Sequence, residues 1–189
     1  MRITGEDTKQ RVEQAAIRMF VRKSVHGATI RDIAQEAGIS LGSMYNHYKS
    51  KEELAWTLWA RNWADTGAGL RQRAKAGKTL AERLHSMISY IFERFEQDWE
   101  LITYVYLSRH EHLKRIRSNL PNPHIVFRMV VVEAMARREI PRQDPDLAAA
   151  MVMGTMVHVI DMKILGRIKP NLMDCVDTVT NGCARLLGL

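Results

Sequence analysis

Residues 29–51 read TIRDIAQEAGISLGSMYNHYKSK, and this stretch decides the fold. Its pattern predicts two short helices joined by a tight turn. Ala34 supplies a small residue where the two helices would cross, and Gly38, four positions later, tolerates the positive φ that the turn needs. Met44, ten positions after Ala34, would anchor the second helix to the core. These offsets are typical of a helix-turn-helix that reads DNA.

The second helix of this pair, which should begin at residue 41, has two distinct faces. At about 100° per residue, its apolar residues fall on one side, and these are Leu41, Met44 and Tyr48. The opposite side carries small or polar residues, namely Gly42, Ser43, Asn46 and His47. Such a surface can enter the major groove of a duplex and offer hydrogen-bond donors and acceptors to base edges.

The same stretch resembles the DNA-binding domain of the TetR family of regulators. The resemblance covers about residues 8–56 without gaps and rests on the blocks TIRDIA, AGIS, GSMYNHY and SKEEL within residues 29–54. Phe20 and Gly27 also stand where the family has an aromatic residue and a glycine. The chain departs from the family at Ser24, Val25 and Tyr48, where glycine, an aromatic residue and phenylalanine are more common.

The resemblance implies a homodimer in which each subunit places its third helix in the major groove of one half of a palindrome. The predicted DNA-binding residues, including the two helix caps, are Thr29, Arg31, Ser40, Gly42, Ser43, Tyr45, Asn46, His47 and Lys51. Tyr45 borders the two helix faces and Lys51 opens the next helix, so both are expected to contact phosphates. For Arg31 and His47, simple solvent exposure is the alternative.

Helical periodicity continues through the rest of the chain and predicts about nine helices and no strand. Capping boxes at residues 50–53 and 79–82, and prolines at 123, 145 and 170, are typical of helix starts. We therefore expect an all-α protein. A three-helix DNA-binding domain would occupy residues 1–52, and a helical ligand-binding and dimerisation domain would occupy residues 53–189.

The charge distribution agrees with an N-terminal module that binds an anion. The 189 residues include 28 Lys and Arg against 21 Asp and Glu, a formal net charge of +7. Residues 1–51 hold nine of the basic and five of the acidic residues, which is more than half of the excess. A polyanionic partner is therefore expected, although this balance alone does not separate nucleic acid from a membrane surface.

Several classes of protein are disfavoured. No signal-peptide core follows Arg2, and the longest apolar run, 147–160, is expected to be a buried helix too short to span a bilayer. We expect a soluble, cytoplasmic protein without a membrane partner. Cys175 and Cys183 would lie about 12 Å apart on one helix, too far for a disulfide, and are expected to be buried thiols.

Catalytic and metal chemistry find no support in the sequence. There is no zinc signature, phosphate loop or nucleophile elbow, so we expect neither an enzyme nor a cofactor. His110 and His112 flank Glu111, but residues two apart do not share a helical face, which argues against a metal site. The basic run at residues 71–78 is expected to be a solvated connection.

The helical body carries large, adaptable apolar side chains that suit an effector pocket, with core packing as the alternative for each. The predicted pocket residues are Trp59, Trp63, Met87, Tyr90, Tyr104, Met129 and Met156. The resemblance implies a repressor that leaves a palindromic operator when a small, largely apolar effector binds. The alternative function is a nucleoid-associated or division-control DNA binder on the same fold, which would need no effector.

The last two long helices combine small and apolar residues that suit a four-helix interface between two copies. The predicted interface residues are Val152, Thr155, Val159, Val176, Val179 and Cys183. Packing of these strips inside one subunit is the alternative.

Overall fold

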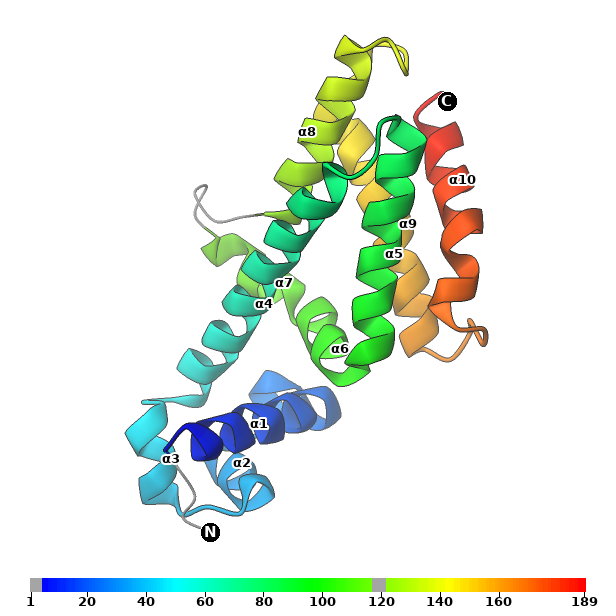
Figure 1. Ribbon diagram of the computed structural model, residues 1–189. Helices are drawn as coiled ribbons and strands as arrows, with labels where there is room; N and C mark the ends of the chain where they lie inside the picture. Colours follow the sequence, from blue (N-terminus) through cyan, green and yellow to red (C-terminus); the bar gives the residue numbers. More distant parts are fainter. Residues whose placement is uncertain (1–4, 117–121) are drawn as a thin grey trace. The chain divides into compact units, whose positions relative to one another are not determined.

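The computed structural model describes residues 5–116 and 122–189 (Figure 1). Over these ranges the chain forms ten α-helices and two short 3-10 helices, and no strand is present in them. The all-α prediction is therefore confirmed.

The described residues divide into two compact units. The first unit consists of residues 5–62 and 100–116, and the second of residues 63–99 and 122–189. Helices α4 (Lys51–Ala74) and α6 (Trp99–Leu107) contribute residues to both units. Periodicity in the sequence did not indicate that residues 100–116 pack with the N-terminal helices, because periodicity reports only on local structure.

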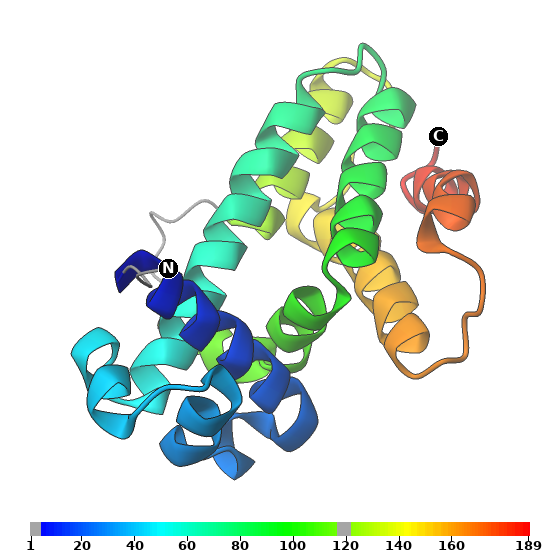
Figure 2. The same ribbon diagram turned by 60° about the horizontal axis from the view of Figure 1, so that its bottom comes forward.

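The first unit is built on α1 (Gly5–Gly27), α2 (Ile30–Ala37) and α3 (Leu41–His47), which Figure 2 shows gathered beside the start of α4. The start of α4, most of α6, and α7 (Arg109–His112) with the 3-10 turn Leu113–Arg115 complete it. The predicted inner face of α1 is confirmed, because its members are at most 7% exposed: Val12, Ala15, Ala16, Met19 and Phe20. The ring of Phe20 lies 5.3 Å from that of Tyr104 on α6, so α6 closes the core.

The second unit contains α5 (Leu80–Gln97), α8 (Pro123–Ala136), α9 (Pro145–Ile164) and α10 (Val176–Leu186). Helix α5 packs against α8 and α10, and α9 packs against α8 and α10. The predicted capping box of α5 is formed by Thr79 and Glu82, and Pro123 and Pro145 stand in the first turns of α8 and α9.

The last helix starts later than predicted. A 3-10 turn, Leu172–Cys175, capped by Asn171, precedes α10. Cys183 is buried as expected, whereas Cys175 lies in the turn and is half-buried; both thiols are free.

The apolar run 147–160 lies in helix α9, and the expectation of a buried helix too short to span a bilayer is wrong. The helix extends over 20 residues, and by length and composition alone it could cross a membrane. Only 28% of its most apolar stretch is buried within this chain, because one face packs on α8 and α10 while the other, which includes Leu147, Ala150 and Gly154, is exposed. A single helix of this kind is also common in helical domains that never meet a bilayer.

Candidate nucleic-acid interface

The turn between α2 and α3 is fixed by local hydrogen bonds that the sequence predicts. Thr29 and Asp32 form a capping box at the start of α2. Gly38 ends α2 with φ of 64°, in the left-handed region where a Cβ would be strained. The Ser40 hydroxyl then accepts a hydrogen bond of 3.1 Å from the backbone N–H of Ser43 and caps α3. The helix-turn-helix geometry therefore arises within residues 29–47.

Helix α2 is held against α1 by charge. Arg18 pairs with Glu36 at 2.8 Å, and Lys23 pairs with Asp32 at 3.1 Å. The backbone N–H and hydroxyl of Thr29, with Lys23, lower the pKa of Asp32 to about 2. The acidic side chains of α2 are thus neutralised inside the unit, while Arg31 on the same helix stays exposed.

The inner face of α3 is anchored as predicted. Met44 is fully buried, and Tyr48, just after the helix, is 5% exposed. The Tyr48 hydroxyl donates a 2.6 Å hydrogen bond to Oε1 of Glu13 on α1, and Arg61 of α4 binds the same carboxylate. Burial, followed by the contact with Glu13, raises the pKa of Tyr48. This partner gives a physical reason for tyrosine where phenylalanine is more common.

The outer face of α3 is open to solvent. Gly42, Tyr45 and Asn46 are exposed, with Tyr45 at 53%, whereas Ser43 and His47 are half-buried. The helix therefore presents a hydroxyl, an amide and an imidazole beside a tyrosine, groups that can both donate and accept hydrogen bonds. Their contacts with DNA remain a prediction.

Lys51 forms two hydrogen bonds within the first unit that the sequence did not predict. Its ammonium donates to the carbonyl oxygens of His26 at 3.0 Å and Ala28 at 2.7 Å. These two bonds close the segment between α1 and α2 over the start of α4. An ammonium has three donors, and the Glu52 carboxylate lies 4.0 Å from this one, so a phosphate would compete with Glu52 for the third N–H.

Ser24 interrupts α1 with φ of 60° and ψ of 168°. This backbone region is almost restricted to glycine. The position is the one at which the chain lacks the glycine expected from the resemblance. The Ser24 hydroxyl accepts a 3.3 Å hydrogen bond from the N–H of Gly27, which partly compensates for the strain.

The predicted pocket residues are divided between the two units. Trp59 and Tyr104 lie in the first unit, where Trp59 donates to the carbonyl of Val105 at 2.9 Å and Tyr104 to that of Ala55 at 2.7 Å. The remaining five belong to the second unit: Trp63, Met87, Tyr90, Met129 and Met156. Met87 and Met156 are buried there, and Met129 lines a hollow between α4 and α8.

Most of the predicted dimer residues are used inside the chain. Val152, Val176, Val179 and Cys183 are at most 8% exposed, as in the alternative of packing within one subunit. Thr155 and Val159 are half-buried. An interface on these helices would therefore have to use their outer faces, beside Thr155 and Val159.

His112 is a buried residue for which the sequence carried no signal. Its ring lies 5.3 Å from that of Trp59 and 5.7 Å from that of Trp56, and neither ring nitrogen has a hydrogen-bond partner. Burial lowers the pKa of His112. Across the described ranges no group of three or more His, Cys, Asp or Glu residues could hold a metal ion.

Comparison with known proteins finds relatives of the N-terminal part. Residues 14–55 match the family described as bacterial regulatory proteins, tetR family. The repressor KstR2 of Mycobacterium tuberculosis is 35% identical over 98 residues, which are 50% of this chain and 48% of that protein. The matched segments span less than half the length of these curated relatives.

Solved structures extend the likeness in fold to nearly the whole chain. A regulatory protein of the tetR family from Rhodococcus RHA1 has a TM-score of 0.81 at 19% identity and covers 95% of this chain and 96% of its own. The regulator FadR from Bacillus subtilis, solved with stearoyl-CoA, has a TM-score of 0.76 at 20% identity and covers 93% and 97%. Residues 14–55 thus resemble the tetR family of bacterial regulatory proteins, and nearly the whole chain has the fold of these solved structures.

Proposed function

We propose that this protein is a transcription regulator that binds a DNA operator through α3. The observation that carries the proposal is the contrast between the two faces of that helix. Met44 and Tyr48 anchor it to the first unit, while Gly42, Tyr45 and Asn46 are exposed on a surface short and polar enough for a major groove. The match of residues 14–55 to the tetR family supports the same reading.

We propose that the protein acts as a homodimer on a palindromic operator. Support comes from α9 and α10, whose outer faces this chain leaves open. Leu147 on α9 and Leu186 on α10 are 61% and 48% exposed. Gly154 and Gly182 are exposed on the same helices, with open space where a Cβ would stand, so a second copy could approach closely. Burying α9 in this way would also account for its apolar composition.

We propose that a small, largely apolar effector binds the second unit and releases the protein from DNA. FadR from Bacillus subtilis, of similar fold, binds stearoyl-CoA. Helix α4 supports the coupling, because it carries Lys51 beside the DNA-binding helices at one end and belongs to the second unit at the other. KstR2 is named as a repressor and FasR of Mycolicibacterium smegmatis as an activator; of the two directions we propose repression. The proposal assigns the protein no enzymatic activity and places it in the cytoplasm.

Footprinting of the full chain on DNA upstream of its own and neighbouring genes tests this function. We expect a protected palindrome with half-site centres about 10 base pairs, or a multiple of that, apart. Binding should weaken steeply as salt is raised, because phosphate contacts release counterions. Absence of any protected palindrome would contradict the proposal. Many scattered sites that no small molecule affects would favour the nucleoid-associated alternative instead.

A further inference from the structure

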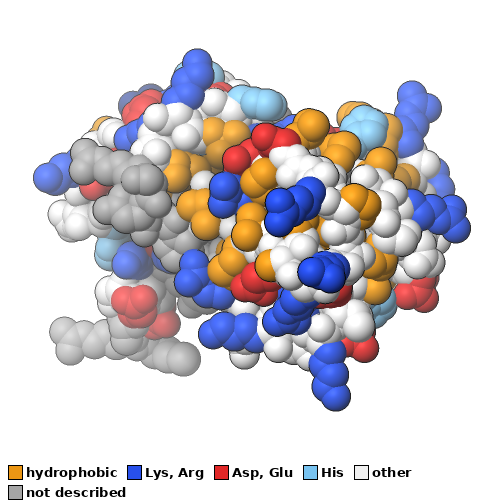
Figure 3. All heavy atoms as spheres, turned by 90° about the horizontal axis from the view of Figure 1, so that it is seen from above, with side chains coloured by type: hydrophobic (Ala, Val, Ile, Leu, Met, Phe, Trp, Pro, Cys, Tyr) orange, Lys and Arg blue, Asp and Glu red, His pale blue; other side chains and the backbone are white. Residues whose placement is uncertain are grey.

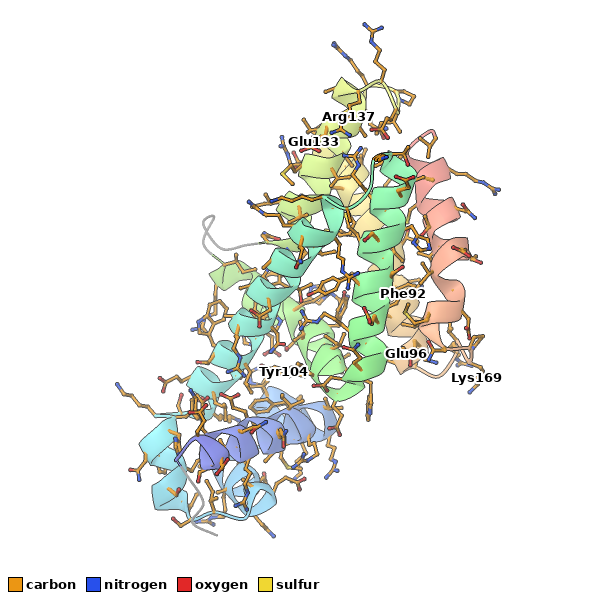
Figure 4. The ribbon with its side chains drawn as sticks, in the orientation of Figure 1. Phe92, Glu96, Tyr104, Glu133, Arg137 and Lys169 are labelled. Carbon is orange, nitrogen blue, oxygen red and sulfur yellow. The ribbon has the colours of Figure 1, made fainter. Side chains whose placement is uncertain are left out.

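A hollow of about 370 Å³ lies at one end of the second unit, between the last turns of α4 and α8 and the start of α5. We call it the α4–α8 hollow. Its apolar lining comes from Ala74, Met129 and Val130, and its charged lining from Arg71, Lys75, Arg83, Glu133 and Arg137. This volume is within the range of sites that bind small molecules, about 300–1,000 Å³. Figure 4 shows Glu133 and Arg137 near the same end of α8.

The wall of the α4–α8 hollow is fixed by one buried guanidinium. Arg83 is 2% exposed, and it binds Glu133 at 3.1 Å and Glu139 at 2.7 Å. Its Nε also donates to the carbonyl oxygen of Thr79 at 3.3 Å. The guanidinium is buried, whereas the Glu133 side chain is 47% exposed, and these charge-assisted hydrogen bonds hold Arg83 in one geometry. The hollow is therefore formed before any ligand arrives.

Three cations of the α4–α8 hollow remain without a carboxylate partner. Arg71, Lys75 and Arg137 form no ion pair with any described residue, and Arg137 only donates to the carbonyl of Lys78 at 3.3 Å. Arg83, Glu133 and Glu139 together carry a net charge of −1, and the three unpaired cations carry +3. The net charge around the hollow is therefore +2. In the view of Figure 3, Lys and Arg side chains lie among hydrophobic ones, with Asp and Glu side chains beside them. The negative ends of the α4 and α8 dipoles offset part of this charge.

We infer that the α4–α8 hollow binds an amphipathic anion, a carboxylate or phosphate group carried on an apolar body. The anionic group would lie between Arg71 and Arg137, which can each donate two parallel hydrogen bonds to an oxyanion. The apolar part would cover Met129 and Val130. The basic run at residues 71–78, expected to be a solvated connection, thereby gains a binding role. That such a ligand acts as the effector rests on the function proposed above.

Isothermal titration calorimetry on the full chain tests the site with decanoate, decyl phosphate, decanol and inorganic phosphate. We expect decanoate or decyl phosphate, whichever head group fits, to bind one per chain at least about tenfold more tightly than decanol or inorganic phosphate. The Arg71→Gln/Arg137→Gln double variant should lose at least about tenfold in affinity for the anion, the equivalent of one charged hydrogen bond. The matched control, Arg142→Gln, removes an exposed cation outside the hollow and should change nothing.

A second variant tests the apolar half without altering charge. Met129→Trp should fill the hollow and lower the affinity for both anions. Circular dichroism checks that the variant remains folded. Equal affinity of the double variant and the wild type, or equal binding of decanol and the anions, would overturn the inference. Operator footprinting tests the proposed function separately. Anion binding without a protected palindrome would refute the proposed regulator but support the anion site. A protected palindrome without anion binding would support the regulator and refute the anion site.

Discussion

At the scale of single residues, Ser24 shows how one side chain can hold an unfavourable backbone. Its φ of 60° with ψ of 168° belongs to a region that costs a non-glycine residue about 1–3 kcal/mol. Val25, the next residue, is 7% exposed and packs in the core. The burial of Val25 and the packing of α1 therefore impose the conformation, and Ser24 tolerates it.

Ser24→Gly should raise the free energy of unfolding by about 1 kcal/mol, because glycine relieves the strain at a smaller cost in chain entropy. Urea denaturation followed by circular dichroism measures the change. Ser24→Ala is the matched control: it keeps the strain and loses the hydrogen bond from Gly27, so it should be less stable than the wild type. A glycine variant no more stable than wild type would show that the strain is absent.

His112 makes the stability of the protein depend on pH. Its pKa in the folded chain lies below the ordinary value of 6.5 because it is buried. Glu111 opposes this shift and Arg115, whose guanidinium lies over Trp56, adds to it. Below pH 6.5 the unfolded chain takes up a proton that the folded chain resists, so stability falls as the pH drops.

His112→Phe should remove this part of the pH dependence, which for one proton is at most about 1.4 kcal/mol per pH unit. Urea denaturation at pH 7.5 and at pH 5.5, followed by tryptophan fluorescence, compares the two proteins. His110→Gln, which changes an exposed histidine two residues away, serves as the control and should behave as wild type. An unchanged difference between the two pH values in the Phe variant would contradict a neutral His112.

At the scale of elements, different residues of α3 are expected to recognise the base sequence and to bind the phosphate backbone of any DNA. Tyr45 is exposed and is expected to reach a phosphate, whereas the half-buried Ser43 belongs to the face expected to meet base edges. Neither side chain is needed for the anchor that Met44 and Tyr48 provide. Substitutions here should therefore leave the fold intact.

Tyr45→Phe should weaken binding to every DNA sequence alike by about 0.5–1.5 kcal/mol, the worth of one hydrogen bond. Ser43→Ala should instead change which base is preferred at one position of each half-site. Fluorescence anisotropy with a set of operators, each altered at one position, distinguishes the two. If Tyr45→Phe changed the ranking of these operators and Ser43→Ala did not, the two roles would be assigned wrongly.

At the scale of the whole molecule, assembly depends on the face of α9 that one chain leaves open. Gly154 has no heavy atom near the place where its Cβ would stand, so a large side chain there would not disturb the single chain. It would obstruct a second copy that packs closely on α9. A substitution at Gly154 should therefore affect assembly without affecting folding.

Gly154→Arg should give a folded monomer that no longer binds the operator. Size-exclusion chromatography with light scattering measures the mass, and footprinting measures binding. Gln72→Arg adds the same charge on an exposed position of α4 and should leave both unchanged. A dimer that persists in the Gly154 variant would move the interface away from this face.

The sequence alone determined what depends on neighbouring residues. Capping residues such as Thr29 and Ser40, the turn at Gly38 and the two faces of α3 were all predicted, because each depends on positions within a few residues of one another. The tertiary structure decided the rest. Glu13 meets Tyr48 across 35 positions, and Lys51 reaches the carbonyl of Ala28 across 23.

The same division explains the sites. His112 beside two tryptophans of α4, and the α4–α8 hollow with its three unpaired cations, each bring together elements that are distant in the chain. The pocket and dimer residues were chosen from helical periodicity, which places an apolar side chain on a helix face. Periodicity does not say whether that face packs inside the chain, as Val152 does, or stays open, as Leu147 does. Only the packing of whole helices against one another decides this.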